Sequence, residues 1–233
     1  MQRLGFTRSA YQTDHLLLTP DTFVRAPRPG MVKATGIVHI SPAAGAKFTG
    51  YTAEFEHEGR LGPADGERFL YVLEGELAVD GSSLSTGGYG YFPPACDASI
   101  GARGAARAIV IEKPYDGATP PAMFTGNESG VPSKALMDDP DLQVRALIPE
   151  DTAFDFAVNT MTFKPGAALS MVEMHVMEHG LMMLEGGGIY RLGEKWYPVT
   201  AGDFIWMAPY CPQWFGAIGK VPAKYLIYKD WNR

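Results

Sequence analysis

Short apolar runs alternate with glycine- and proline-rich breaks along the whole chain. The runs LYVLEGELAV, YGYFPP, AIVIE, GIYRL, FIWMAP and YLIY are rich in β-branched and aromatic residues, which are favoured in strands. GMVKATGIVHI, YTAEFE, QVRALIPE and FAVNTMTFKPG predict further strands. Because breaks this frequent leave little room for long helices, the pattern predicts an all-β chain of short strands joined by tight turns.

Two segments of the chain, residues 68–96 and 179–211, resemble each other. A Leu-Glu-Gly triplet occurs at 73–75 in the first segment and at 184–186 in the second. Each triplet lies between two predicted strands, and a further apolar strand follows each segment. We interpret the two segments as copies of one duplicated unit.

The match between the copies predicts the domain organisation. Gly88 is matched with Gly202, each opening an apolar run that closes at proline. We expect an N-terminal barrel over residues 1–115, a linker over 116–145 with room for one short helix, and a C-terminal barrel over 146–233. The predicted fold class is therefore two antiparallel β-barrels, or jelly rolls, in tandem.

Composition and charge narrow the class of protein. Of the 233 residues 46% are hydrophobic, enough to fill a core, and the formal net charge of −6 argues against a nucleic-acid partner. No apolar run is long enough for a transmembrane helix, and the N-terminus lacks the apolar stretch of a secretory signal. We expect a cytoplasmic protein without a membrane partner, in which Cys96 and Cys211 are small buried hydrophobes.

Two of the five histidines fall close together in SMVEMHVMEHGLMML. On a strand, Glu173, His175 and His179 share one face, and imidazole and carboxylate are good ligands for a divalent ion. A bare His-x3-His is more often polar surface than a metal site. On a helix the two histidines would also face together, as in zinc peptidases, but HVMEH does not have the HExxH order.

The repeat supplies a control for this candidate metal site. The first copy has Gly62, Ala64 and Arg68 where the second has the Glu and two His, and Ser99 where the second has Gln213. Core packing would not require this asymmetry, whereas a functional site in the second copy alone would. We therefore expect the first barrel to lack metal ligands.

These residues resemble the motifs of the cupin family. The first cupin motif has the form G-x5-HxH-x3,4-E-x6-G, and this chain has Glu173-x-His175-x3-His179 between Gly166 and Gly186. The second motif, G-x5-PxG-x2-H, is matched by Gly202-x5-Ala208-x-Tyr210-x2-Gln213. The spacing agrees with a bicupin, but the ligand types are permuted, and Ala208 and Tyr210 depart from the Pro and Gly of the motif.

The permuted set, in the second half of a bicupin, resembles the (S)-ureidoglycine aminohydrolase family of allantoin degradation. The resemblance runs along nearly the whole chain and includes EMHVMEHG, WYPVTAGDFIWM and YLIYKDWNR. It implies a manganese-dependent, homo-oligomeric hydrolase that converts a small anionic ureido acid, ureidoglycine, to ureidoglycolate and ammonia. The metal ligands that it implies are Glu173, His175, His179 and Gln213.

The same resemblance assigns Tyr190, Tyr225 and Lys229 to the substrate, with Glu173, Tyr225 and Lys229 in catalytic roles. Tyr225 and Lys229 are four residues apart on one predicted strand and so share a face, although a lysine there would also be explained as the solvated end of the strand. The oxygen and nitrogen ligands suit Mn²⁺, and Fe²⁺, Co²⁺ or Ni²⁺ could compete.

Two alternatives from other functional classes stay open at this point. One is a cupin dioxygenase or isomerase acting on another small acid, although oxygenase cupins more often have His at the position of Gln213. The other is a non-enzymatic ligand-binding bicupin, and no basic region or DNA-binding helix pair favours a regulator.

Overall fold

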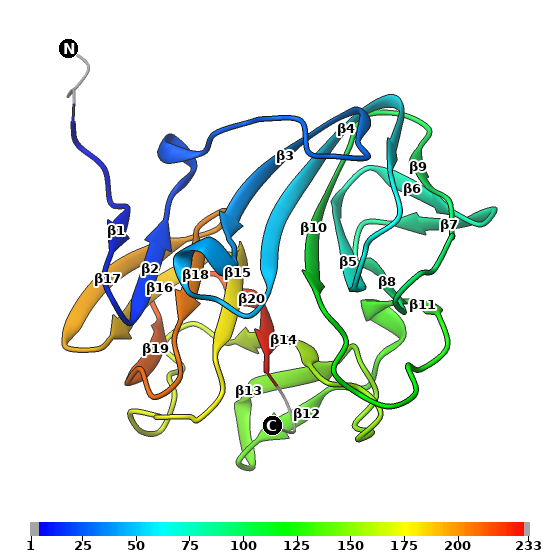
Figure 1. Ribbon diagram of the computed structural model, residues 1–233. Coiled ribbons are helices and arrows are strands. Elements are labelled where there is room, and N and C mark those ends of the chain that lie inside the picture. The colour runs from blue at the N-terminus through cyan, green and yellow to red at the C-terminus, as the bar shows by residue number, and fades with distance from the viewer. Residues whose placement is uncertain (1–4, 231–233) are drawn as a thin grey trace. The chain divides into compact units, whose positions relative to one another are not determined.

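The computed structural model describes residues 5–230, and this part of the chain contains strands and three short 3-10 helices but no α-helix (Figure 1). The all-β prediction is therefore confirmed. None of the helices described is long and apolar enough to cross a membrane. The strands form two compact units, each with its own sheets and core.

One unit, which we call the site unit, combines the described residues up to Phe23 with residues 133–146 and the chain from Phe156 onward. Its strands are β1 (Ala10–Tyr11), β2 (His15–Leu18), β12 (Lys134–Leu136), β13 (Asp139–Ala146), β14 (Ala157–Phe163), β15 (His179–Glu185), β16 (Gly187–Leu192), β17 (Lys195–Thr200), β18 (Phe204–Met207), β19 (Gln213–Ala217) and β20 (Ala223–Lys229). A 3-10 helix, η1 (Pro20–Thr22), follows β2.

The site unit has one eight-stranded sheet, β1-β2-β18-β15-β20-β14-β13-β12, and one three-stranded sheet, β17-β16-β19. Its core draws on both sheets: Phe163 of β14 packs edge to face on Phe215 of β19, with Tyr225 of β20 against both rings. All three side chains are buried. The two sheets therefore pack on a shared apolar core.

The other unit, which we call the plain unit, comprises residues 24–132 and 147–155. Its strands are β3 (Val32–Ile40), β4 (Thr49–Leu61), β5 (Glu67–Glu74), β6 (Glu76–Val79), β7 (Ser82–Ser85), β8 (Gly88–Phe92), β9 (Ile100–Ala102), β10 (Ala106–Lys113) and β11 (Phe124–Asn127), with the 3-10 helices η2 (Pro42–Ala44) and η3 (Glu128–Gly130). They form one sheet in the order β11-β8-β5-β10-β4-β9-β6-β7, with β3 also on β4.

The predicted domain boundaries differ from these units. Residues 116–145 are not a linker, because β11 pairs with β8 of the plain unit and the β12–β13 hairpin joins β14 of the site unit. Residues 5–23 belong with the C-terminal half, because β2 pairs with β18 and places Leu17 in that core. Arg8 binds Asp203 through two hydrogen bonds of 2.6 and 2.8 Å in the same unit. These are non-local pairings, which strand periodicity does not reveal.

The internal repeat is visible in the backbone, although one pair of matched glycines differs from the prediction by one residue. Gly75 and Gly186 both have a left-handed φ, +77° and +62°, directly after the equivalent strands β5 and β15. The N–H of Gly87 donates to Val72 O and that of Gly202 to Met183 O, both at 2.9 Å. The counterpart of Gly202 is therefore Gly87, and the predicted match to Gly88 was wrong by one residue.

Candidate metal centre

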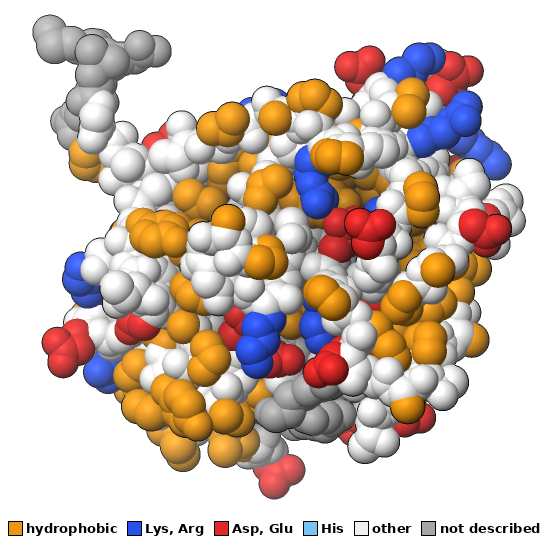
Figure 2. Space-filling model, in the orientation of Figure 1, with side chains coloured by type: hydrophobic (Ala, Val, Ile, Leu, Met, Phe, Trp, Pro, Cys, Tyr) orange, Lys and Arg blue, Asp and Glu red, His pale blue; other side chains and the backbone are white. Residues whose placement is uncertain are grey.

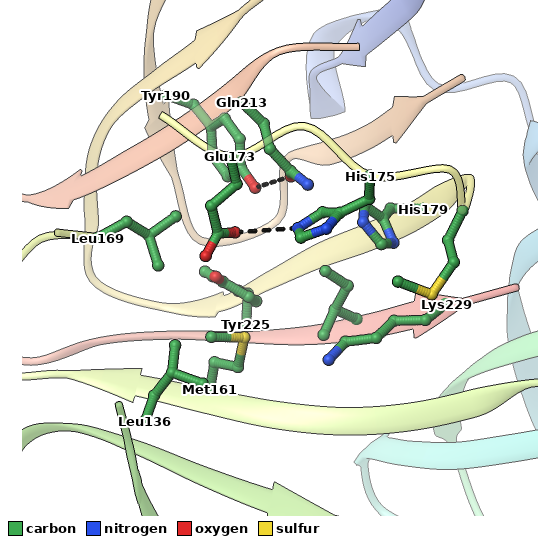
Figure 3. A pocket seen from close by; sticks show the side chains of 12 residues that line it. Leu136, Met161, Leu169, Glu173, His175, His179, Tyr190, Gln213, Tyr225 and Lys229 are labelled. Carbon is green, nitrogen blue, oxygen red and sulfur yellow. Dashed lines mark hydrogen bonds and ion pairs between the residues drawn. The ribbon is translucent and has the colours of Figure 1, made fainter. Parts of the chain in front are cut away.

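A single pocket of the site unit contains all seven predicted site residues (Figure 3). Its volume is about 140 Å³. The lining consists of Glu173, His175, His179, Tyr190, Gln213, Tyr225 and Lys229, together with Leu136, Met161, Leu169, Met177 and Ile227. Sequence reasoning missed the five apolar residues, because nothing distinguishes a leucine or methionine beside a pocket from one in the core.

The segment that carries Glu173 and His175 was predicted to be a strand, and this was only partly right. Between β14 and β15 the chain forms two isolated bridges, Ala168 with Gly216 and Glu173 with Gln213. In the second, Glu173 N donates to Gln213 O at 2.8 Å and Gln213 N donates to Glu173 O at 2.9 Å. The side chains nevertheless alternate, with Met174 and Val176 exposed and Glu173 and His175 half-buried in the pocket. The two-residue period is thus kept without a ladder.

Glu173, His175 and His179 converge as their spacing predicted. Glu173 Oε2 lies 3.2 Å from His175 Nε2, and the rings of His175 and His179 are 5.3 Å apart at 76°. His179 begins β15 and is 3% exposed. Its burial, followed by the charges of His175 and Lys229, lowers its pKa to about 3. The ring is therefore neutral at ordinary pH, and neutral imidazole is the form that binds a metal.

Gln213 is held at the same centre by its backbone and its side chain. It begins β19, pairs with Leu192 of β16, and is 3% exposed. The Tyr190 hydroxyl donates to Gln213 Oε1 at 3.2 Å, and Tyr190 itself is fully buried (Figure 3). Tyr190 also lines the pocket, and its predicted contact with the substrate stays a prediction.

Tyr225 and Lys229 occupy the β20 wall of the pocket. Tyr225 is 2% exposed, and burial raises its pKa well above 10, so its hydroxyl stays a neutral donor. Lys229 pairs with His179 across β15 and β20. The side-chain amide of Asn159 has one orientation in which both its nitrogen and its oxygen are hydrogen-bonded. In that orientation the amide oxygen accepts a hydrogen bond from Lys229 Nζ at 3.1 Å. Lys229 is therefore a pocket residue, and the explanation of a solvated strand end does not apply.

The donor set fits a divalent cation. One carboxylate, two imidazoles and one amide oxygen approach a common space from three parts of the chain, and none of them is a thiolate (Figure 3). Such oxygen and nitrogen donors suit the divalent ions of the first transition series better than soft ions. Glu173, His175, His179 and Gln213 are the residues that could hold the metal.

The equivalent position of the plain unit is filled by an ion pair. Arg68 pairs with Glu112 across β5 and β10, in the register that His179 and Lys229 share across β15 and β20. Arg68 Nε donates to Glu112 Oε1 at 2.8 Å, and the Tyr51 hydroxyl donates to the same oxygen at 2.7 Å. These groups satisfy one another, and the absence of metal ligands from the first copy stays a prediction.

A second cluster of ligand-type side chains was not found from the sequence. Asp14, His15 and Cys211 bring their ligand atoms within 4.8 Å of one another in the site unit. His15 Nδ1 lies 2.8 Å from Asp14 Oδ1, and His15 Nε2 lies 2.8 Å from the Tyr197 hydroxyl. Cys211 is 4% exposed, as predicted for a buried cysteine. No sequence signal could join these residues, because the pairing of β2 with β18 brings them together.

Comparison with known proteins identifies related chains. A model of the cupin domain matches residues 159–228. The (S)-ureidoglycine aminohydrolase of Arabidopsis thaliana is 40% identical over 240 residues, which cover 98% of this chain and 80% of that protein. The (S)-ureidoglycine aminohydrolase of Escherichia coli K12 is 32% identical over 231 residues, with 93% and 88% covered. The crystal structure of the E. coli protein Ylba matches with a TM-score of 0.85 at 28% identity, over 97% of this chain and 95% of that one.

Proposed function

Because this all-β bicupin belongs to the (S)-ureidoglycine aminohydrolase family, we propose that it hydrolyses (S)-2-ureidoglycine to (S)-ureidoglycolate and ammonia. The observation that carries the proposal is the convergence of four metal donors and Lys229 in one pocket. In this reaction the C–N bond to the amino group breaks, a C–O bond to the oxygen of water forms, and the amine leaves with one proton of that water. The step belongs to allantoin degradation in purine catabolism.

The proposed cofactor is Mn²⁺, held by Glu173, His175, His179 and Gln213. When bound, a divalent ion supplies positive charge and Lewis acidity beside these donors. The neutral state of His179 and the absence of sulfur among the four donors support this assignment. Fe²⁺, Co²⁺ and Ni²⁺ are competitors on the same grounds.

The residues assigned to the substrate would have different roles: Lys229 would bind its charged group, and Tyr225 would orient it. Lys229 lines the pocket, and its ammonium group would hold the substrate carboxylate or give a proton to the departing amine. The neutral Tyr225 hydroxyl would orient the substrate by a hydrogen bond. Glu173 lies beside His175 and could take up the proton that water loses.

The size of the pocket supports a small substrate. A volume of about 140 Å³ is well below the ~300–1,000 Å³ typical of sites for drug-sized ligands. The apolar side of the lining, which includes Leu136 and Leu169, offers no hydrogen bonds and limits how many polar groups a ligand can bring. A compact acid with its polar groups toward one wall fits these limits.

We also propose a cytoplasmic homo-oligomer. Exposed apolar side chains, among them Met171, Met174, Val176 and Tyr210, lie along and next to the segment that carries Glu173 and His175. The drawn face of the molecule has hydrophobic side chains gathered in several places among charges of both signs (Figure 2). Exposed apolar surface of this kind is common at protein–protein contacts. Sedimentation or light scattering at several concentrations measures the state.

The direct test is ammonia release from freshly prepared ureidoglycine by the Mn²⁺-loaded protein. Release should exceed the spontaneous rate and should be lost in Glu173→Gln, which keeps the shape of the side chain but removes its charge. Glu194→Gln, at an exposed position away from the pocket, is the matched control and should retain activity. Wild-type protein with bound metal that released no ammonia above the spontaneous rate would refute the assignment.

A further inference from the structure

We propose that Asp14, His15 and Cys211 form a second cation site, separate from the pocket, that binds a thiophilic divalent ion such as Zn²⁺. The three residues come from the start of β2 and from the turn between β18 and β19, and none of them lines the pocket. A carboxylate, an imidazole and a thiolate together form a donor set that Zn²⁺ accepts. This proposal does not depend on the catalytic assignment.

The positions of the donor atoms are close to those that an ion requires. In a tetrahedral zinc site a sulfur and an oxygen or nitrogen ligand lie about 3.5 Å apart, given bonds of about 2.3 Å and about 2.0 Å. All three donor atoms already lie within 4.8 Å of one another. His15 Nδ1 and Asp14 Oδ1 are 2.8 Å apart and need to separate only slightly for an ion to bind between them. The donor atoms therefore need to close separations of at most 4.8 Å to about 3.5 Å, which changes in side-chain rotation can supply.

Tyr197 supplies the outer partner that a histidine ligand needs. Its hydroxyl lies 2.8 Å from His15 Nε2, and a hydroxyl can either donate or accept. When Nδ1 binds an ion, the ring proton moves to Nε2, and the Tyr197 oxygen accepts the hydrogen bond from it. Metal-binding histidines usually donate their other N–H in this way, which fixes the ring and its tautomer.

The net charge of the three donors and their access to solvent also fit a divalent ion. The Cys211 thiol gives up its proton to solvent as the S–Zn bond forms, so that one thiolate, one carboxylate and one Zn²⁺ together are neutral. His15 and Cys211 are buried, whereas the Asp14 side chain is 44% exposed and offers the side from which an ion can enter.

Gly193 keeps that side open. It has a φ of +58°, and a Cβ at this position would lie 3.1 Å from Asp14 Oδ2 and 3.7 Å from His15 Cε1. A larger residue would crowd the carboxylate and the ring. Glycine therefore leaves the donor atoms room to adjust around an ion.

The test uses Cd²⁺ as the probe, because cadmium–thiolate bonds give an ultraviolet charge-transfer band that oxygen and nitrogen ligands do not. The four donors in the pocket include no sulfur, so an ion there is silent in this measurement. The full-length protein, with Mn²⁺ present, is titrated with Cd²⁺. We expect the band to saturate at one ion per chain, to disappear when Zn²⁺ is added, and to be accompanied by the release of one proton.

The two cysteines provide a matched pair of variants. Cys96→Ser, in the plain unit, should keep the band, and Cys211→Ser should lose it. Asp14→Asn should keep the band but weaken binding at least about tenfold. If circular dichroism showed that Cys211→Ser does not fold, Asp14→Asn with Cys96→Ser would decide the question. The proposal is overturned if no stoichiometric band forms, if the band depends on Cys96, or if Asp14→Asn binds as tightly as the wild type.

Discussion

Replacing Tyr190 with Phe separates two roles that this tyrosine could have in the pocket. The hydroxyl donates to Gln213 Oε1 at 3.2 Å, and both side chains are buried. If this bond orients a metal ligand, then Tyr190→Phe weakens metal binding and leaves the interaction with the substrate nearly unchanged. If the hydroxyl instead contacts the substrate, as the family resemblance implies, the variant changes the KM at saturating metal.

The size of the effect follows from the burial of the pair. Removing the donor leaves Gln213 Oε1 without this partner in a site that is 3% exposed, which costs about 1–3 kcal/mol of folding stability in the metal-free protein. Loss of an outer partner of a metal ligand typically weakens metal affinity about 10- to 100-fold. That range corresponds to about 1.4–2.8 kcal/mol. We therefore expect the Mn²⁺ dissociation constant to rise by this factor.

The assay has two parts and one matched control. The Mn²⁺ dissociation constant is measured by titration of metal-free protein, and KM and kcat for ammonia release are then measured with Mn²⁺ in large excess. Tyr225→Phe is the control, because Tyr225 lines the same pocket and is equally buried. It should change the KM or kcat and leave the Mn²⁺ dissociation constant within about threefold. A wild-type Mn²⁺ affinity in Tyr190→Phe, with a raised KM, would refute the reasoning.

The remaining predictions concern the charge of the pocket and the stability of the plain unit. Lys229→Met should raise the KM for the anionic substrate roughly 10- to 100-fold, since a hydrogen bond to a charged group is worth about 1.5–3 kcal/mol, and steady-state ammonia release measures this. Asn159→Asp should raise the KM more than Asn159→Ala does, because a carboxylate within reach of Lys229 Nζ would offset its charge; equal values in the two variants would contradict this. Burial, with a smaller effect of Arg107, lowers the pKa of His39 to about 3, whereas an unfolded histidine titrates near 6.5. The unfolded state therefore binds the extra proton as the pH falls from about 6.5 towards 3, and stability declines across that window. Chemical denaturation of wild type and His39→Asn as a function of pH should show a flatter curve for the variant.

How far the sequence predicts the site depends on the kind of signal that each residue carries. Glu173, His175 and His179 were placed together by a two-residue period, and that period survives even though no strand covers Glu173 and His175. Gln213 could be added only by the family motif, and it reaches the others because its backbone pairs with that of Glu173. The hydrogen bond from Tyr190 to Gln213 could not be predicted, because the direction of one hydroxyl depends on packing.

The fold class was predictable, and the division of the chain was not. Apolar runs and breaks identify strands, but they do not identify the partner of each strand. Strand β2 was assigned to the first half by its position in the sequence, and its actual partner is β18. The match of Gly88 to Gly202 failed for a related reason, since two adjacent glycines look alike in sequence. Only Gly87 has the left-handed φ, +80°, and the hydrogen bond that define the turn.

In the two copies of the repeat, the same pair of facing strand positions has different roles: a structural contact in one copy and part of the pocket in the other. At the paired position of β5 and β10 the plain unit has Arg68 and Glu112, which neutralise each other at 2.8 Å. At the same position of β15 and β20 the site unit has His179 and Lys229, which cannot neutralise each other. A pair that is complete in itself leaves nothing for a ligand to satisfy. His179 and Lys229 instead line the pocket together with the carboxylate of Glu173 and the amide of Gln213, so the register that closes on itself in the plain unit faces a cavity in the site unit.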